Sequence, residues 1–278
     1  HPQHQRLVDA ADRYLALVSA KEAEATRPAV QLKAARVFYA YNQFPEALGR
    51  FEAIVKATPR SEQAVVAANL VVDVHNLRQD WTKLYEAARR YLDTPELLEG
   101  RPKLQKELER FGEYAKFALV QADYEQAKAG AADLASVARA FEDFSREFPR
   151  SDNADEALFN ASVILDRVGA KERASELRQR LLERYPDSPL RADVAYYVAK
   201  RLQERTAYGP ASKALLRFAR EFPEDERARD ALYDASVLLA GTGRSAAAAK
   251  VREQYLDRYR RSDDAEEVAF AIAADLER

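Results

Sequence analysis

The sequence predicts an all-α fold built from repeated two-helix units, and three observations lead to this prediction. Pro149, Pro186 and Pro223 lie 37 residues apart, and the next step of 37 falls on Arg260 in a matching context. Small residues and Leu recur at the same period between these landmarks. Only eight of the 278 residues are Gly, which suits helices better than turn-rich β architectures. A period of this length is typical of a solenoid of stacked helical hairpins.

A helix is expected to begin shortly after each landmark. The residue two positions beyond each landmark is polar, and its side-chain oxygen can accept a hydrogen bond from the unpaired amides of a helix start. These expected N-caps are Ser61, Ser151, Ser188, Asp225 and Ser262. The repeating unit is therefore expected to be a helix, a short turn, a second helix, and then Pro or its substitute.

Two columns of small residues indicate where paired helices approach each other. In the first helix of each unit the members are Ser162, Ala199, Ser236 and Ala273. In the second helix they are Ala174, Ala211 and Ala248. Small side chains let two helix axes approach at the short end of the range of about 8–10 Å, so both columns are expected in the core.

This spacing resembles the tetratricopeptide repeat (TPR), in which a small residue, an Ala and a Pro follow one another at intervals of twelve. Ser162, Ala174 and Pro186 match that spacing. Near the start of the chain the matching residues are Ala35, Ala47 and Pro59, with Phe38 and Phe51 at the two aromatic positions of the family. Later units replace the second aromatic by Arg178, Leu215 and Arg252. The period of 37 also departs from the usual unit of about 34.

The segment from Arg184 to Tyr196 is similar to the longer TPR variant of bacterial cell-envelope proteins. Examples are the outer-membrane β-barrel assembly lipoprotein and the periplasmic coordinator associated with Tol-Pal. The resemblance covers roughly Val30 to Arg278. It implies a right-handed α-solenoid of about seven TPR-like hairpins that binds other proteins on its concave face.

The repeat pattern predicts one solenoid over residues 1–278, with three regions. Residues 1–95 are expected to form the N-terminal repeats, and residues 149–278 the regular repeats of 37. The period breaks between them, so residues 96–148 are expected to form an extended hairpin with one long helix.

The long helix is predicted over Arg101 to Lys128, a stretch of high helix propensity with no Pro after Pro102. At about 26 residues it would be roughly 40 Å long. One interpretation is a longer packed helix. The other is a protruding docking or dimerisation surface centred on Phe111, Tyr114, Phe117 and Tyr124.

A paired column of acidic and aromatic residues is the sharpest functional signal. The acidic members are Glu156, Asp193, Asp230 and Glu267. The aromatic members, three residues further on, are Phe159, Tyr196, Tyr233 and Phe270. At 100° per residue, both columns point away from the core-facing stripe of the first helix. We call these eight residues the ladder, and each acidic and aromatic pair a rung.

Two interpretations of the ladder are open. Acidic residues near a helix start are stabilised by the helix dipole, and an aromatic residue on the flank packs on the neighbouring unit. Alternatively, the ladder lines the concave face and holds a partner segment with Lys or Arg beside apolar side chains. Such a segment would be held by cation–π and charge contacts.

Other kinds of site find little support. The chain has no Cys, which excludes thiolate metal sites and thiol nucleophiles, and we expect no metal, cofactor or catalytic residue. The Gly241-Thr-Gly243 run predicts a helix-terminating turn, since no strand precedes it as in a dinucleotide loop. His75 is expected to be a surface or capping residue.

An isoelectric point of about 6.1 disfavours nucleic acid binding, and no apolar run approaches the ~20 residues of a membrane span.

We therefore expect a non-catalytic protein-protein interaction scaffold. The resemblance implies a bacterial cell-envelope assembly or machinery, in the periplasm or cell envelope, with the cytoplasm as the alternative. Two other functions stay open. One is the helical superstructure of a larger cell-wall-cleaving enzyme whose catalytic domain lies outside this sequence. The other is a homo-oligomerising structural module that uses the long helix.

Overall fold

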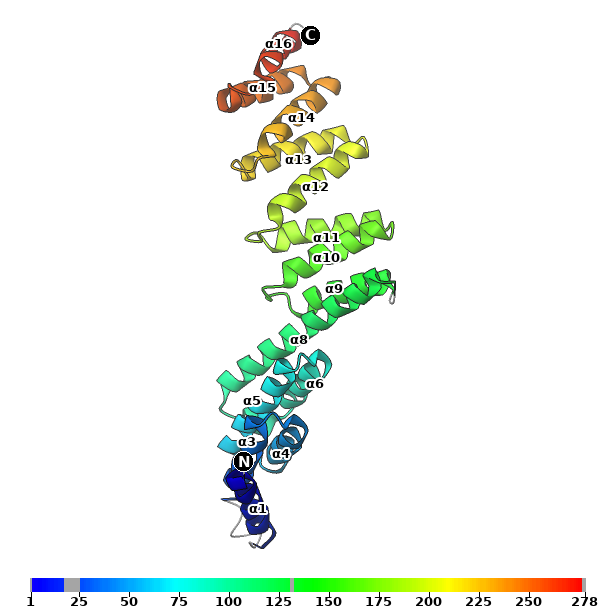
Figure 1. Ribbon diagram of the computed structural model, residues 1–278. Helices are drawn as coiled ribbons and strands as arrows, with labels where there is room; N and C mark the ends of the chain where they lie inside the picture. Colours follow the sequence, from blue (N-terminus) through cyan, green and yellow to red (C-terminus); the bar gives the residue numbers. More distant parts are fainter. Residues whose placement is uncertain (1, 18–25, 131–132, 277–278) are drawn as a thin grey trace. The chain divides into compact units, whose positions relative to one another are not determined.

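A computed structural model describes residues 2–17, 26–130 and 133–276, and within them it contains helices and no strand (Figure 1). The chain folds into two compact units, which we call unit 1 (His1–Ala129) and unit 2 (Gly130–Arg278). The predicted all-α, solenoid-type fold is confirmed, because consecutive helices pack on one another within each unit.

Unit 1 is built from two complete helical hairpins and the helices that flank them. Its described helices are α1 (Pro2–Leu17), α3 (Arg27–Ala40), α4 (Phe44–Ala57), α5 (Glu62–Leu77), α6 (Trp81–Leu92), α7 (Pro95–Leu98) and α8 (Pro102–Lys128). The hairpins are α3 with α4 and α5 with α6, and α8 packs on α6. Their shared core includes the fully buried side chains of Phe51, Ile54 and Leu84.

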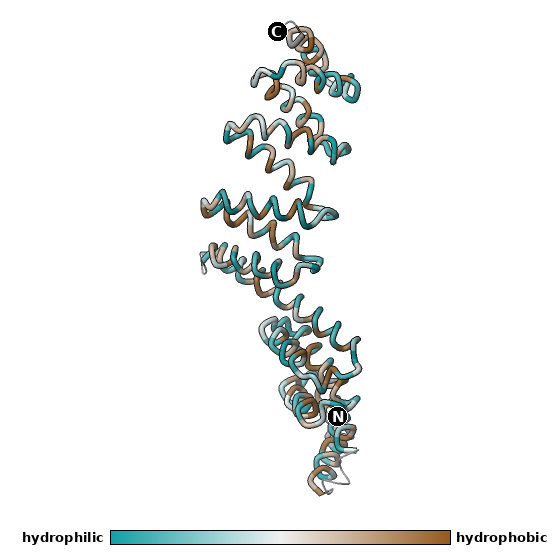
Figure 2. Tube along the Cα trace, turned by 180° about the vertical axis from the view of Figure 1, so that it is seen from behind, coloured by the Kyte–Doolittle hydropathy of each residue, from teal (hydrophilic) through white to brown (hydrophobic). Residues whose placement is uncertain are grey.

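Unit 2 continues with helices of nearly uniform length. They are α9 (Leu134–Glu147), α10 (Ala154–Arg167), α11 (Lys171–Arg184), α12 (Arg191–Glu204), α13 (Tyr208–Glu221), α14 (Ala228–Gly241), α15 (Ser245–Tyr259) and α16 (Ala265–Leu276). Each packs on the next in chain order, as Figure 1 shows. The complete hairpins are α10 with α11, α12 with α13 and α14 with α15. Hydrophilic and hydrophobic residues alternate along these helices, as amphipathic packing requires (Figure 2).

The small-residue columns lie in the core, as predicted, except for Ala273. Ala174, Ala211 and Ala248 of the second helices are fully buried. Of the first-helix column, Ser162, Ala199 and Ser236 are buried, whereas Ala273 of α16 is exposed. Because the buried small residues keep the spacing of the tetratricopeptide repeat, the hairpins are TPR-like.

The expected N-caps are confirmed only in unit 1. Ser61 directly precedes α5, and its side-chain oxygen accepts a hydrogen bond from the Ala64 amide at 3.0 Å. The corresponding residues of unit 2 lie three positions before their helices, which the N-cap prediction missed. The reason is a tight turn: the Ser151 hydroxyl accepts from the Asn153 amide, and α10 begins only at Ala154.

The turn inside each hairpin also recurs in register. One residue per turn has a positive φ, and these residues are Asn42, Gln79, Gly169, Thr206 and Gly243. The next residue donates its amide to a carbonyl five positions back, for example Arg244 to Leu239 at 2.9 Å. This is the Schellman-type ending of a helix. The predicted helix-terminating turn at Gly241-Thr-Gly243 is therefore confirmed.

The predicted long helix is α8, which has 27 residues. Its buried side chains extend from Leu104 to Ala127. Gly112 permits a close approach to α6, because a Cβ atom there would lie 3.6 Å from the Ala88 methyl. Since α8 belongs to unit 1 and α9 to unit 2, the region 96–148 is shared between the two units.

Candidate protein-binding surfaces

The acidic members of the ladder lie near the N-termini of the first helices α10, α12, α14 and α16. Asp193, Asp230 and Glu267 are exposed, and Glu156 is half-buried. Glu156 accepts a hydrogen bond from the Asn160 amide group at 3.5 Å. One carboxylate per hairpin is therefore presented at the surface at a constant sequence spacing.

The two tyrosines of the ladder pack within their own hairpins. The Tyr196 ring centroid lies 5.1 Å from that of Phe218 on α13, and the Tyr233 centroid lies 6.4 Å from that of Tyr255 on α15. Both tyrosines are half-buried, whereas Phe270 of α16 is 78% exposed. Phe159 is half-buried as well. The tyrosine rings thus help to hold the two helices of a hairpin together while remaining partly exposed.

Sequence reasoning missed the partners of these rings, although a signal for them exists. The second helices carry their own column with a period of 37, formed by Phe144, Leu181, Phe218 and Tyr255. All four are buried. An aromatic or aliphatic column at the repeat period in both helices of a unit predicts contact between the two columns.

An arginine of the chain itself occupies the second rung. A guanidinium nitrogen of Arg227, the residue before α14, lies 2.8 Å from the Asp193 carboxylate. The guanidinium carbon lies 5.1 Å from the centre of the Tyr196 ring. Asp225 fixes this arginine by accepting hydrogen bonds of 2.8 and 2.7 Å, and the hydrogen bond from Arg227 is the main reason that the pKa of Asp225 is lowered. This rung therefore binds a cation by charge and by its ring face together.

The third and fourth rungs are joined across hairpins. The Tyr233 hydroxyl donates a hydrogen bond of 3.0 Å to Glu267 on α16. This hydrogen bond, with a smaller contribution from burial, raises the pKa of Tyr233. The acidic group of one hairpin is thus held by the aromatic residue of the preceding one.

The aromatic residues predicted as a docking surface on α8 differ in exposure. Tyr114 is 48% exposed and meets Trp81 edge to face, with the ring centroids 5.5 Å apart. Phe117 is buried, and Phe111 and Tyr124 are half-buried. Within this set Tyr114 offers the most exposed ring, and the docking role of α8 stays a prediction.

Arg178, which departs from the TPR pattern, is buried between hairpins. A guanidinium nitrogen lies 2.7 Å from Asp166 on α10, and the guanidinium carbon lies 3.9 Å from the centre of the Tyr197 ring on α12. The Tyr197 hydroxyl completes the triad by donating to Asp166 at 2.6 Å. This triad connects α10, α11 and α12, and its role is structural.

The expectation that His75 is a surface or capping residue is wrong. It is only 6% exposed, because α5 packs against both α4 and α6. Burial lowers its pKa. Across the described residues no group of three or more His, Cys, Asp or Glu could hold a metal ion. No helix in the described ranges is both long and apolar enough to span a bilayer.

No known protein family matches the sequence, and no curated protein matches it. The solved structures that are similar to the chain include the following three, all at low identity. PilW, a widely conserved type IV pilus biogenesis factor, shows a TM-score of 0.37 and 14% identity over 88% of this chain and 99% of its own. PilF of Pseudomonas aeruginosa shows a TM-score of 0.36 and 14% identity over 86% of this chain and 95% of its own. A STAND-class signal transduction ATPase with a TPR sensor, from Pyrococcus horikoshii, shows a TM-score of 0.40 and 16% identity. The match covers 98% of this chain and 40% of that protein. These scores are low, so the description of the fold rests on the hairpins themselves.

Proposed function

We propose that this chain is a protein-binding scaffold whose ladder holds a basic segment of a partner protein. The observation that carries the proposal is the second rung, where Asp193 and Tyr196 already hold the guanidinium of Arg227. An acidic residue with an aromatic three residues further on recurs in each first helix of unit 2 from α10 onward. The rungs that Arg227 does not occupy are therefore suited to Lys or Arg side chains of a partner.

The third and fourth rungs are the most accessible. The Asp230 side chain is 57% exposed, and its contact with Arg229 is an exposed pair at 3.2 Å. Exposed ion pairs contribute only about 0–1 kcal/mol, so an incoming cation can replace Arg229. The exposed Phe270 ring of the fourth rung offers apolar surface to such a segment.

We further propose that the scaffold acts in a bacterial cell envelope, without a catalytic step of its own. Support for this location comes from the resemblance of the segment Arg184 to Tyr196 to longer TPR units of envelope proteins. The partners are other proteins, since both surfaces that the ladder offers, carboxylates and ring edges, are complementary to basic and apolar side chains.

Fluorescence polarisation with a labelled peptide of alternating Lys and Leu tests the ladder. The variant Asp230→Asn with Glu267→Gln removes two exposed charges while nearly preserving shape. We expect the peptide to bind this variant about tenfold more weakly at low salt, because two unscreened charge contacts are lost.

The matched control is Glu253→Gln with Asp257→Asn, which makes the same change of charge at two exposed positions of α15. This control should bind the peptide as the wild type does, and circular dichroism should be unchanged for both proteins. Equal affinity of the ladder variant and the wild type would refute the proposal. So would an equal loss in the control, because the effect would then come from net charge alone.

A further inference from the structure

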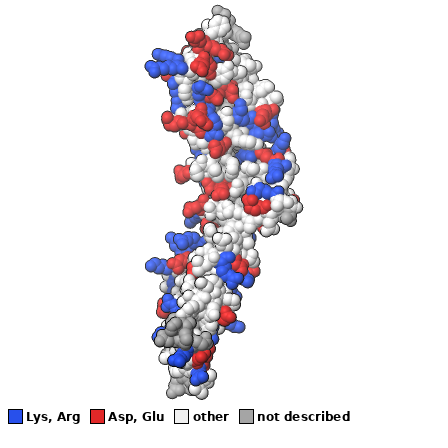
Figure 3. Space-filling view, in the orientation of Figure 1, with Lys and Arg blue, Asp and Glu red and all other residues white. Residues whose placement is uncertain are grey.

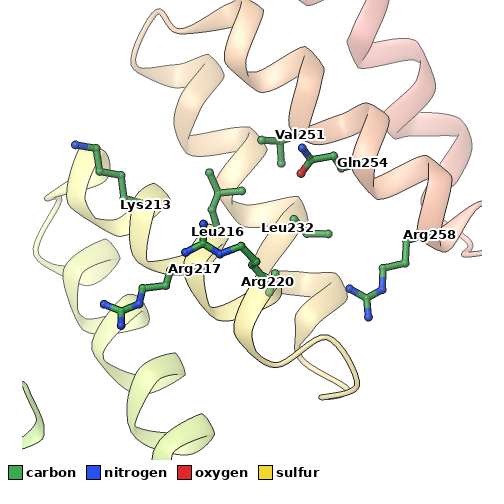
Figure 4. Close-up of a pocket in the computed structure, with 9 residues that line it drawn as sticks. Lys213, Leu216, Arg217, Arg220, Leu232, Val251, Gln254 and Arg258 are labelled. Atoms are coloured by element: carbon green, nitrogen blue, oxygen red, sulfur yellow. The ribbon is translucent and has the colours of Figure 1, made fainter. Parts of the chain in front are cut away.

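A second surface lies mainly on the second helices of unit 2. It is a groove of about 600 Å³ between α13 and α15, with a residue of α14 in its floor (Figure 4). Its cations are Lys213, Arg217, Arg220 and Arg258. Its apolar floor includes Leu216, Leu232 and Val251. We call it the basic groove.

Two of the four cations have no ion-pair partner among the described residues. Lys213 and Arg220 are exposed and form no ion pair with another described residue. Arg217 is paired with Glu221 at 2.7 Å, and Arg258 lies 3.6 Å from Glu224. The groove therefore has an excess of positive charge, whereas the face in Figure 3 shows acidic and basic side chains interspersed.

The repeat itself does not require these residues. At the four positions of Lys213, Leu216, Arg217 and Arg220, the preceding unit has Glu176, Gln179, Arg180 and Glu183. The following unit has Lys250, Glu253, Gln254 and Asp257. Packing of the second helix depends on its buried side chains, among them Ala211, Leu215 and Phe218. The combination of these exposed cations with the half-buried Leu216 is thus particular to α13.

We propose that the basic groove binds an acidic segment of a partner protein, in which Asp or Glu alternates with apolar residues. Carboxylates would meet Lys213 and Arg220, and a guanidinium can bind a carboxylate through two parallel hydrogen bonds. The apolar side chains would cover Leu216 and Leu232.

This groove and the ladder take segments of opposite charge, so the two proposals can fail separately. The test uses fluorescence polarisation with two labelled peptides, one alternating Glu and Leu and the other alternating Lys and Leu. The variant Lys213→Glu with Arg220→Glu introduces the residues that α11 carries at the same positions, so the hairpin is expected to fold. We expect this variant to bind the Glu and Leu peptide at least about tenfold more weakly, with no loss for the Lys and Leu peptide.

The matched control is Lys103→Glu with Lys106→Glu, which reverses two exposed charges on α8 of unit 1. It should bind the Glu and Leu peptide as the wild type does. Leu216→Gln, which copies Gln179, tests the floor and should weaken binding severalfold while leaving all four cations in place.

Several results would overturn the proposal. They include no saturable binding of the Glu and Leu peptide by the wild type, and equal affinity of the double variant and the wild type. A Glu and Ser peptide that binds as tightly as the Glu and Leu peptide would show that the floor is not used. Tighter binding of a single-stranded oligonucleotide would assign the groove to phosphates instead. Self-association that disappears in the double variant would assign it to a second copy of this chain.

Discussion

Two neighbouring hairpins of unit 2, α10/α11 and α12/α13, share one backbone frame of 37 residues but carry different side chains at equivalent positions. In the turn, Gly169 with φ of 84° corresponds to Thr206 with φ of 57°. In the second helix, the buried Arg178 corresponds to the buried Leu215. The backbone path is the same while the side-chain chemistry is not. The frame therefore depends on the small-residue columns and on the turns, and each interior position can be filled in more than one way.

The interiors of the two hairpins differ in their sensitivity to substitution. Leu215 is fully buried in an apolar cluster with Phe218 and Leu232. Arg178 depends instead on Asp166 and Tyr197, and its second terminal nitrogen has no hydrogen-bond partner among the described residues. A buried ion pair contributes little net stability, but removal of one member leaves an unpaired buried charge. The first hairpin should therefore be more sensitive to a single substitution.

The largest expected effect is that of Asp166→Ala. The Arg178 side chain is 4% exposed and would lose the one carboxylate that pairs with it in the part of the chain that the structure describes, and Tyr197 would lose its acceptor. We expect the free energy of unfolding to fall by about 3 kcal/mol in urea denaturation at neutral pH. Asp143→Ala removes an exposed pair with Arg146 and should change it by less than about 0.5 kcal/mol.

The pH dependence sharpens this prediction. Burial by itself would raise the pKa of Asp166, but hydrogen bonds from Tyr197 and Arg178 outweigh it, and the pKa is lowered. A carboxylate with a lowered pKa stabilises the fold above its unfolded pKa of about 3.9, and the contribution is lost as pH falls through the folded value. The difference between wild type and Asp166→Ala should therefore shrink below about pH 4. A difference that stays constant there would contradict an electrostatic origin.

The next largest effect is the recovery of stability when a second substitution is added to Asp166→Ala. Adding Arg178→Leu to Asp166→Ala gives the first hairpin the residue that the second has at this position. The unpaired charge disappears and the apolar side chain can pack, so about 2 kcal/mol of the lost stability should return. The double-mutant cycle measures this coupling. A double variant no more stable than Asp166→Ala alone would show that the two hairpins do not accept the same residue.

The elements that could be predicted from the sequence are those that recur. The period of 37, the buried Ala columns and the long helix α8 follow from residues that repeat or that lack Pro. In the ladder, the surface position of Asp193, Asp230 and Glu267 follows from helical geometry in the same way. A regular pattern specifies a backbone because every unit needs the same close approach of helices.

Contacts that occur once were not predictable in this way. Arg227 lies over Tyr196 in one rung only, because its counterparts one repeat away are Leu190 and Asp264. His75 is buried because α5 has neighbours on two sides, which no local pattern shows. The basic groove depends on side chains of α13, α14 and α15 that meet where two successive hairpins pack together. Such sites require the three-dimensional arrangement, since the repeat period says nothing about departures from it.

The smallest expected effect concerns the turns. A β-branched residue at positive φ is strained by about 1–3 kcal/mol, and Thr206 has this conformation. Gly169 also has a positive φ, but it is not strained because glycine has no Cβ atom. Thr206→Gly relieves the strain but adds freedom to the unfolded chain and removes a hydrogen bond from the Thr hydroxyl to the Arg205 carbonyl. The net gain should be about 0.5 kcal/mol in the free energy of unfolding, seen as a small rise in urea midpoint. Gly169→Thr should lower stability by about 1 kcal/mol, since it introduces the strain. If Thr206→Gly destabilised the protein instead, the two turns would not be equivalent and the shared backbone frame would be wrong at this point.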